Sequence, residues 1–345
     1  MEFARRTEFQ RNEELERLLA ELNSLLEPIE AELLDDYQMP RYPVVFVVGA
    51  PRSGSTLMMQ WLAHTGRFAY PTNLLSRFYA APFVGAKIQQ LLTAPEYGFR
   101  DELVDLASEI SFSSSLGKTR GALAPNEFWY FWRRFIPNTE PRHLDAESLG
   151  KIRPRELVAE FAAIEAALGK PLALKGLILE LNLPFLSSIL DRALFLFVKR
   201  HPFYTIQSLL ESREQYFGNR RDWYSIKPKE YDLLKGLDPF EQVAGQVYFT
   251  NRTISDDLQQ IDVARWLVVD YERFCSAPRQ TFERIMTKFS QQGTHVHWDY
   301  TGPEQFHHTN QIRLPEEDCT RIGLAYRHFS GKDIMPAKNM RAKLR

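Results

Sequence analysis

The sequence predicts an α/β fold with three layers, in which helices flank a central, mostly parallel sheet. Buried strand-like runs alternate with helical patterns along most of the chain, which is the order that parallel sheets require. The first such run, Val44–Val48, is continuously β-branched or aromatic, which is typical of a strand covered on both faces. A glycine-containing loop and a helical pattern over 56–64 follow it. This order of strand, loop and helix opens a βαβ unit.

Residues 8–36, before that strand, are predicted to form an amphipathic helix. Apolar residues recur there at steps of three and four, separated by Glu and Arg. Pro28 should kink this helix or divide it in two. The apolar face either packs against its own domain or forms a short coiled coil with a second copy of the chain, since a heptad pattern runs as far as Glu32. A homodimer through this helix is therefore one of two expectations.

The later part of the chain continues the alternation. Further strands are expected at 172–175, 193–199 and 265–269, and further helices at 154–168, 202–216, 240–261 and 278–290. Two stretches rich in Pro, Gly, Ser and aromatic residues are predicted to be irregular insertions that form a cleft, about 70–150 and 217–239. The predicted organisation is a helical segment, one α/β domain with both insertions and a basic tail, over 1–40, 41–335 and 336–345.

Composition argues against several classes of protein. The 345 residues include 43 Lys and Arg and 44 Asp and Glu, a net charge of −1 that gives no support to nucleic-acid binding. Cys275 and Cys319 form neither a disulfide scaffold nor a metal-ligand spacing. No apolar stretch is long enough for a membrane span, and the first residues lack the apolar core of a secretion signal. We therefore expect a soluble, cytoplasmic protein.

The loop after the first strand carries the most functional information. It reads GAPRSGST over Gly49–Thr56, whereas phosphate-binding P-loops read GxxxxGK[ST]. The glycines and the final threonine keep that spacing, so backbone N–H groups and the positive end of the next helix can bind an anion. Ser55 replaces the lysine that reaches the outer phosphates of ATP, and Arg52 adds a cation inside the loop. The sequence therefore predicts a P-loop-like fold that binds a phosphate group, although not as an ATPase does.

A second motif lies in LFLFVKRHPFYTIQS, residues 194–208. Arg200 ends a predicted strand, and in doubly wound folds that end of the strand borders the ligand crevice. Its planar guanidinium suits a phosphate group. Pro202 fits the first turn of the next helix, and Ser208 lies about two turns along that helix, where its hydroxyl can donate another hydrogen bond.

Together the two motifs resemble those of sulfotransferases that use 3′-phosphoadenylyl sulfate (PAPS). In that family the loop binds the 5′-phosphosulfate, and an Arg–Ser pair with the spacing of Arg200 and Ser208 binds the 3′-phosphate. Two further segments fit. VVDYERFCSAP over 268–278 resembles the family's YEx[LF]xxxP segment, and HTNQ over 308–311 lies where the family closes a loop over the nucleotide. The resemblance spans 44–315 and is greatest to bacterial and carbohydrate-type members, which use PRSG[ST]T.

The resemblance implies an activity and a set of binding residues. The reaction moves a sulfuryl group from PAPS to a hydroxyl, or less readily an amine, of a small-molecule or glycan acceptor, and leaves adenosine 3′,5′-bisphosphate (PAP). The branch favours a carbohydrate or another hydroxylated metabolite as acceptor. Such transfer depends on positioning and electrostatic stabilisation, and no acidic cluster in the sequence indicates a metal site. The residues implied in donor binding are Pro51, Arg52, Ser53, Gly54, Ser55, Thr56, Arg200, Ser208, Tyr271, Thr309 and Asn310.

Three residues are candidates for catalysis. Arg52 is expected to stabilise the leaving phosphate, and Lys175, at the end of a predicted strand, stands close to the position of the family's catalytic lysine. Many members carry a histidine two residues further on, where this chain has Leu177. The replacement candidate for the general base is Glu127, in PNEFWYFWRR, which is similar to PxE[FW]xx[FW]W of bacterial relatives. Among aromatic residues, burial should raise the pKa of this carboxyl.

Alternatives remain open at this point. Glu127 can instead pair with Arg133 or Arg134 or cap a helix, and the aromatic residues beside it can line an acceptor pocket or form core. Two other functions also fit a phosphate loop. One is a nucleotide or small-molecule kinase, for which Asp270 is the strand-end acid suited to Mg²⁺ but Ser55 lacks the required charge. The other is a nucleotide-binding module without activity, against which the retained cations argue.

Overall fold

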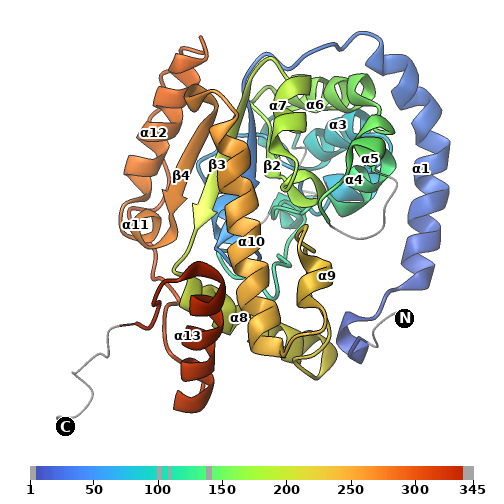
Figure 1. Ribbon diagram of the computed structural model, residues 1–345. Helices are drawn as coiled ribbons and strands as arrows, with labels where there is room; N and C mark the ends of the chain where they lie inside the picture. The colour runs from blue at the N-terminus through green and yellow to red at the C-terminus, as the bar shows by residue number, and fades with distance from the viewer. Residues whose placement is uncertain (1–4, 99–102, 108–109, 137–141, 337–345) are drawn as a thin grey trace.

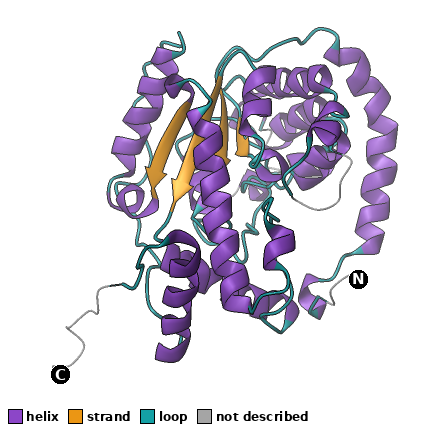
Figure 2. Ribbon diagram, viewed as in Figure 1, coloured by secondary structure: helices purple, strands orange, loops and turns teal. Residues whose placement is uncertain are grey.

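A parallel sheet forms the middle layer of the molecule (Figure 1 and Figure 2). The computed structural model describes residues 5–98, 103–107, 110–136 and 142–336. Within these residues the sheet has four strands in the order β2-β1-β3-β4, all parallel. The strands are β1 Val44–Val48, β2 Ala173–Lys175, β3 Ala193–Lys199 and β4 Trp266–Asp270. This is the α/β fold with three layers that the sequence predicts.

Helices cover both faces of this sheet. In the described part of the chain they are α1 Glu13–Leu34, α2 Ser55–His64, α3 Pro82–Thr93, α4 Trp129–Phe135, α5 Ala146–Gly150, α6 Pro154–Leu168, α7 Leu183–Ile189, α8 Pro202–Phe217, α9 Tyr231–Leu234, α10 Pro239–Gln259, α11 Tyr271–Ser276, α12 Pro278–Gln291 and α13 Glu316–Ser330. Phe46 and Phe195 stack on one face and pack with α4, α6 and α7. Val45 and Leu196 point to the other face and pack with α2, α11 and α12. Because both faces are covered, β1 is apolar without alternation.

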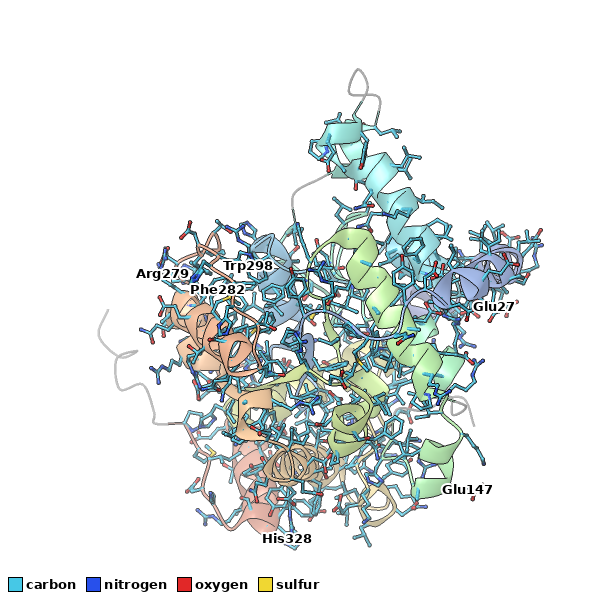
Figure 3. All side chains as sticks on the ribbon, turned by 90° about the horizontal axis from the view of Figure 1, so that it is seen from above. Glu27, Glu147, Arg279, Phe282, Trp298 and His328 are labelled. Atoms are coloured by element: carbon cyan, nitrogen blue, oxygen red, sulfur yellow. The ribbon has the colours of Figure 1, made fainter. Side chains whose placement is uncertain are left out.

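Figure 3 shows the side chains from above. Helix α12 has a buried apolar face, which includes Phe282, and an exposed polar face, which includes Arg279. A third apolar cluster lies beyond the carboxyl ends of the strands, where α8, α10 and α13 pack together (Figure 1). This cluster includes Ala50, the residue after the first glycine of the phosphate loop. The start of the phosphate loop therefore packs against this cluster at the carboxyl end of the sheet.

α1 is one helix that packs on its own chain. It runs through Pro28 and is not divided there. Asn23 donates to the backbone oxygen of Arg77 at 2.8 Å and accepts from the backbone N–H of Ala80 at 2.7 Å. Glu30 accepts hydrogen bonds from two N–H groups in the first turn of α3, at 2.7 and 3.1 Å. Three apolar side chains of its outer face are exposed: Leu18, Leu25 and Ile29.

Several helices lie outside the ranges that the sequence predicts, among them α7, α11 and, in the 217–239 stretch expected to be irregular, α9. Residues 70–150 are expected to be irregular, but they contain α3, α4 and α5. Gly85 weakens the helical pattern of α3, and it is there because a Cβ would overlap the side chain of Phe78. Helix α13 is not expected either, although its buried residues Cys319, Ile322 and Tyr326 recur at helical steps. Among the described residues, no helix has both the length and the apolar character needed to cross a membrane.

Candidate active site

The phosphate loop joins β1 to α2, and its turn depends on two glycines. Gly49 and Gly54 have φ angles of +152° and +102°. A Cβ on Gly49 would overlap a backbone carbonyl of β3, and a Cβ on Gly54 would overlap the ring of Tyr271. Arg52 also has a positive φ, +69°, which is uncommon for a residue with a side chain. Ser53 is 1% exposed, and its hydroxyl has no hydrogen-bond partner among the described residues.

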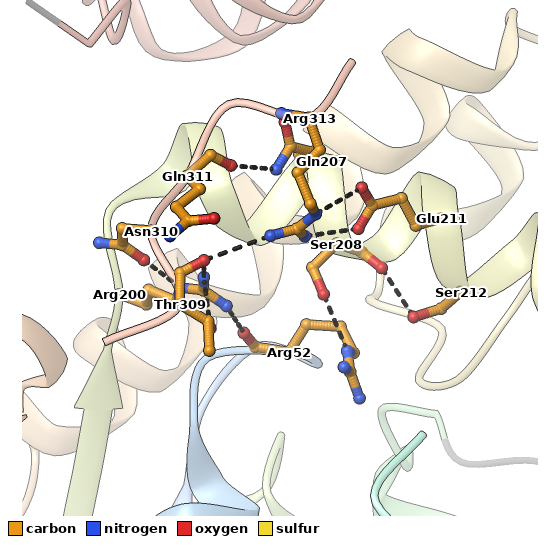
Figure 4. Close-up of polar contacts among 10 residues, drawn as sticks. All are labelled: Arg52, Arg200, Gln207, Ser208, Glu211, Ser212, Thr309, Asn310, Gln311 and Arg313. Atoms are coloured by element: carbon orange, nitrogen blue, oxygen red, sulfur yellow. Dashed lines mark hydrogen bonds and ion pairs between the residues drawn. The ribbon is translucent and has the colours of Figure 1, made fainter. Parts of the chain in front are cut away.

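Arg200 connects this loop to two other segments (Figure 4). It follows β3 directly, and its guanidinium donates to Asn310 Oδ1 at 2.8 Å and to Arg52 O at 3.3 Å. It also donates to the backbone and hydroxyl oxygens of Thr309, at 3.1 and 3.2 Å. The Arg52 side chain in turn donates from Nε to Ser208 Oγ at 3.1 Å. The residues of the three motifs therefore meet at one place.

The segment 308–311 is held there by two residues that the sequence analysis did not single out. Glu272, in α11, accepts a hydrogen bond from Asn310 Nδ2 at 2.6 Å. Gln207, in α8, donates to a backbone carbonyl of the segment at 2.8 Å (Figure 4). Tyr271 lies beside the guanidinium described above, with 5.1 Å between the Arg Cζ and the ring centroid. Glu272 and Gln207 stand next to the predicted residues Tyr271 and Ser208 in the chain, and this adjacency is the signal that could have identified them.

A second group of contacts forms around Lys175, which ends β2. Its ammonium donates to Thr56 Oγ1 at 2.9 Å and to Glu127 Oε1 at 3.0 Å. Lys118 lies on the other side of that carboxylate, 3.6 Å from Oε2. The chain can turn away from β2 this close to β1 because Gly176 lacks a Cβ, which would overlap a methyl group of β1. The structure thus brings together two of the proposed catalytic residues and the last residue of the phosphate loop.

The charge state of Glu127 differs from the sequence expectation. Burial by itself raises the pKa of Glu127, but the charges of Lys175 and Lys118 outweigh burial, so the pKa lies below its ordinary value. The expectation of a raised pKa is therefore wrong, because it considered only the aromatic neighbours in the chain. Arg134 pairs with Glu160 at 2.7 Å and not with Glu127. The aromatic side chains that follow belong to the core: Phe128, Phe131, Trp132 and Phe135.

Two further titratable residues near this cluster lie outside the sequence motifs. Burial raises the pKa of Glu180 to about 8, while a hydrogen bond from the backbone of Gly49 and the charge of Lys175 oppose it. Burial raises the pKa of Tyr224 to about 12, and Arg52 lowers it. Neither residue had a local signal, since Glu180 ends a tight turn after β2 and Tyr224 lies in the 217–239 insertion.

The sequence and the structure were compared with those of known proteins. No curated protein matches the sequence. Among solved structures, sulfotransferase STF1 from Mycobacterium tuberculosis H37Rv matches at 12% identity and a TM-score of 0.48, covering 90% of this chain and 82% of that one. Sulfotransferase STF9 from Mycobacterium avium matches at 13% identity and a TM-score of 0.45, covering 87% and 71%. The sulfotransferase domain of the Synechococcus PCC 7002 olefin synthase matches at 20% identity and a TM-score of 0.38, covering 76% of each chain.

The family comparison is more informative than these distant structures. A profile of the sulfotransferase family matches residues 43–292, which is more than half of the chain. The matched range contains the phosphate loop, Lys175, Arg200 and Ser208, the residues around which the candidate site is built. On this evidence the chain belongs to the sulfotransferase family.

Proposed function

We propose that this chain transfers the sulfuryl group of PAPS to the hydroxyl group of an acceptor and releases PAP. The observation that supports this most strongly is that Arg52 of the phosphate loop contacts both residues of the second motif, Arg200 and Ser208. Arg52 belongs to the phosphate loop, its backbone oxygen accepts from Arg200, and its side chain donates to Ser208. A nucleotide with phosphate groups at both its 5′ and 3′ positions suits two anion-binding motifs side by side.

The residues present fit the donor. On the proposed 5′ side, the loop N–H groups and the start of α2 favour negative charge, and the buried Ser53 hydroxyl has no partner among the described residues. On the proposed 3′ side, Arg200 supplies a planar fork and Ser208 a hydroxyl. Thr309 and Asn310 hold the guanidinium of Arg200 in place, so they position it for the nucleotide.

The proposed reaction has one bond-forming and one bond-breaking event. The acceptor oxygen bonds to sulfur while the bond from sulfur to the bridging phosphate oxygen breaks, and that oxygen takes the negative charge. Arg52 and Lys175 stabilise this charge electrostatically. The acceptor proton passes to the carboxylate of Glu127, whose lowered pKa keeps it ionised at neutral pH. Such a carboxylate is a weak base, so the proton moves once the forming bond to sulfur has made the acceptor more acidic.

Three expectations from the sequence belong to this proposal. The acceptor is a carbohydrate or another hydroxylated small molecule, the site of action is the cytoplasm, and no metal ion takes part. A homodimer through α1 remains a prediction as well, and the exposed Leu18, Leu25 and Ile29 are the side chains that would meet the second copy. Sedimentation of the wild-type chain and of a variant with Leu25→Glu tests the dimer, because a charge in that contact should leave only monomer.

Binding and turnover measurements test the main proposal. Calorimetry should show that the chain binds PAP in preference to ATP–Mg²⁺, and labelled PAPS should transfer sulfate to members of a panel of alcohols, sugars and phenols. Preference for ATP–Mg²⁺ would indicate a kinase instead. PAP binding without transfer to any acceptor would indicate a nucleotide-binding module without activity.

A further inference from the structure

The hydroxyl of Tyr224 makes one long hydrogen bond, to the turn that lies beside Glu127. It lies 3.5 Å from the backbone oxygen of Leu116, at the long limit for a hydrogen bond. Tyr224 is partly buried, and hydroxyl groups that are shielded from water usually have a closer partner, because an unpaired one costs free energy. The weak contact therefore leaves this donor available to another molecule.

Tyr224 contacts Leu116, and the next residue along that turn, Gly117, lies against Glu127. Ser115 and Lys118 exchange two backbone hydrogen bonds of 3.0 and 2.8 Å, and they enclose Leu116 and Gly117 at φ +48° and +84°. Positive φ at both central residues describes a primed turn. A Cβ on Gly117 would lie 3.4 Å from Glu127 Oε1 and 3.6 Å from a hydroxyl of α2. The tip of this turn therefore covers the proposed general base.

The position of Tyr224 is fixed from the other side. Its ring meets Tyr216 edge to face, with 5.4 Å between the centroids, and also contacts Phe217. Its backbone oxygen accepts from the amide of the fully buried Gln246 at 2.8 Å. The next residue, Ser225, has a φ of +70°, an uncommon conformation for a residue with a side chain. Packing thus holds a strained turn that keeps the ring at the site.

Tyr224 is suited to donate a hydrogen bond. Burial raises its pKa to about 12, so the hydroxyl keeps its proton at neutral pH, although the charge of Arg52 opposes this shift. A donor at this place can bind an acceptor oxygen through a lone pair and leave the acceptor's own proton free for Glu127.

We propose that Tyr224 is an acceptor-binding residue, which holds the acceptor hydroxyl against Glu127. This inference rests on the proposed function and deepens it, because it names the residue of the acceptor side. The turn at 115–118 contacts the Tyr224 hydroxyl through Leu116 and lies against Glu127 at Gly117. Neither segment belongs to the motifs that bind the donor.

The test compares Tyr224→Phe with Tyr216→Phe, a matched loss of one hydroxyl in the same group of rings. Calorimetry measures PAP affinity, thermal unfolding measures stability, and transfer of labelled sulfate from PAPS to a series of alcohols, sugars and phenols measures turnover. Tyr224→Phe should lower kcat/KM for alcohols by about tenfold or more, while the PAP dissociation constant and the melting temperature stay at wild-type values. Tyr216→Phe should behave as the wild type.

The outcomes separate the two proposals. Wild-type rates with Tyr224→Phe, or equal losses in both variants, overturn the role of Tyr224 while the sulfotransferase activity stands. A loss of PAP affinity in Tyr224→Phe also overturns it, because the residue would then act on the donor. A wild-type chain that neither binds PAP nor transfers sulfate refutes the proposed function, and the role of Tyr224 with it.

Discussion

Replacing Arg200 by alanine should weaken nucleotide binding far more than it slows the chemical step. The side chain is 8% exposed, and its guanidinium bonds to Asn310, Thr309 and the backbone of Arg52. The variant therefore loses two things, the proposed contact to the 3′-phosphate and the clamp that holds the 308–311 segment on the phosphate loop. Because the 3′-phosphate lies away from the transferred group, kcat should change less than the donor KM.

The magnitude follows from the kind of contact that is lost. Hydrogen bonds between charged groups contribute about 1.5–3 kcal/mol, so the PAP dissociation constant of Arg200→Ala should rise about 10- to 150-fold. Arg200→Lys keeps the charge but not the planar fork, and it should fall between the wild type and Arg200→Ala. Ser208→Ala removes a single hydroxyl donor to the same charged phosphate, so its loss should lie at the lower end of this range, about tenfold.

Calorimetry with PAP and with adenosine 5′-monophosphate measures the part that depends on the 3′-phosphate. The preference of the wild type for PAP should shrink in Arg200→Ala. Arg313→Ala is the matched control, since Arg313 donates to Thr309 O at 3.3 Å and pairs with Glu211 of α8, and so holds the same segment. The reasoning is refuted if Arg200→Ala keeps the full preference for PAP, or if Arg313→Ala reproduces the whole loss.

Three further predictions concern the chemical step and the core. Arg52→Ala should lower kcat more than PAP affinity, because the proposed role is on charge that grows in the transition state, and equal losses would place Arg52 in ground-state binding. Glu127→Gln should keep PAP affinity and lower turnover by about 10² or more, with the smallest loss for phenols of low pKa. Because two lysines lower the pKa of Glu127, the wild-type rate should not decrease on mild acidification from neutral pH. A decrease there that the variant abolishes would contradict this. Glu160→Gln should make stability less dependent on pH. Burial raises the pKa of Glu160 from 4.5 to about 8, so the contribution of this group to the free energy of unfolding is complete below pH 4.5 and is lost as pH rises to 8, by at most about 5 kcal/mol. Denaturant unfolding should show the variant gaining on the wild type across that range, and a constant difference would mean that the wild-type carboxyl is ionised throughout.

The sequence alone determined the layers, the strands of the sheet and the phosphate loop between β1 and α2. β1 and β3 have the predicted limits, 44–48 and 193–199, because a strand covered on both faces has a pattern that local composition reveals. The spacing of Gly49 and Gly54 was equally informative, since each has a positive φ, a backbone requirement that glycine meets with the least strain. Helix α3 was not predicted, because Gly85 interrupts its helical pattern and the fit against Phe78 that requires this glycine is visible only in the structure.

The tertiary structure decided what depends on residues far apart in the chain. Lys118, Glu127 and Lys175 come from separate segments, and only their meeting sets the sign of the pKa shift of Glu127, because burial and the two positive charges act in opposite directions. Tyr224 reaches the same place through a turn of the 217–239 insertion, against another turn more than a hundred residues earlier. Local spacing carries no record of such contacts, since packing of the whole chain determines which loops meet above the ends of the strands.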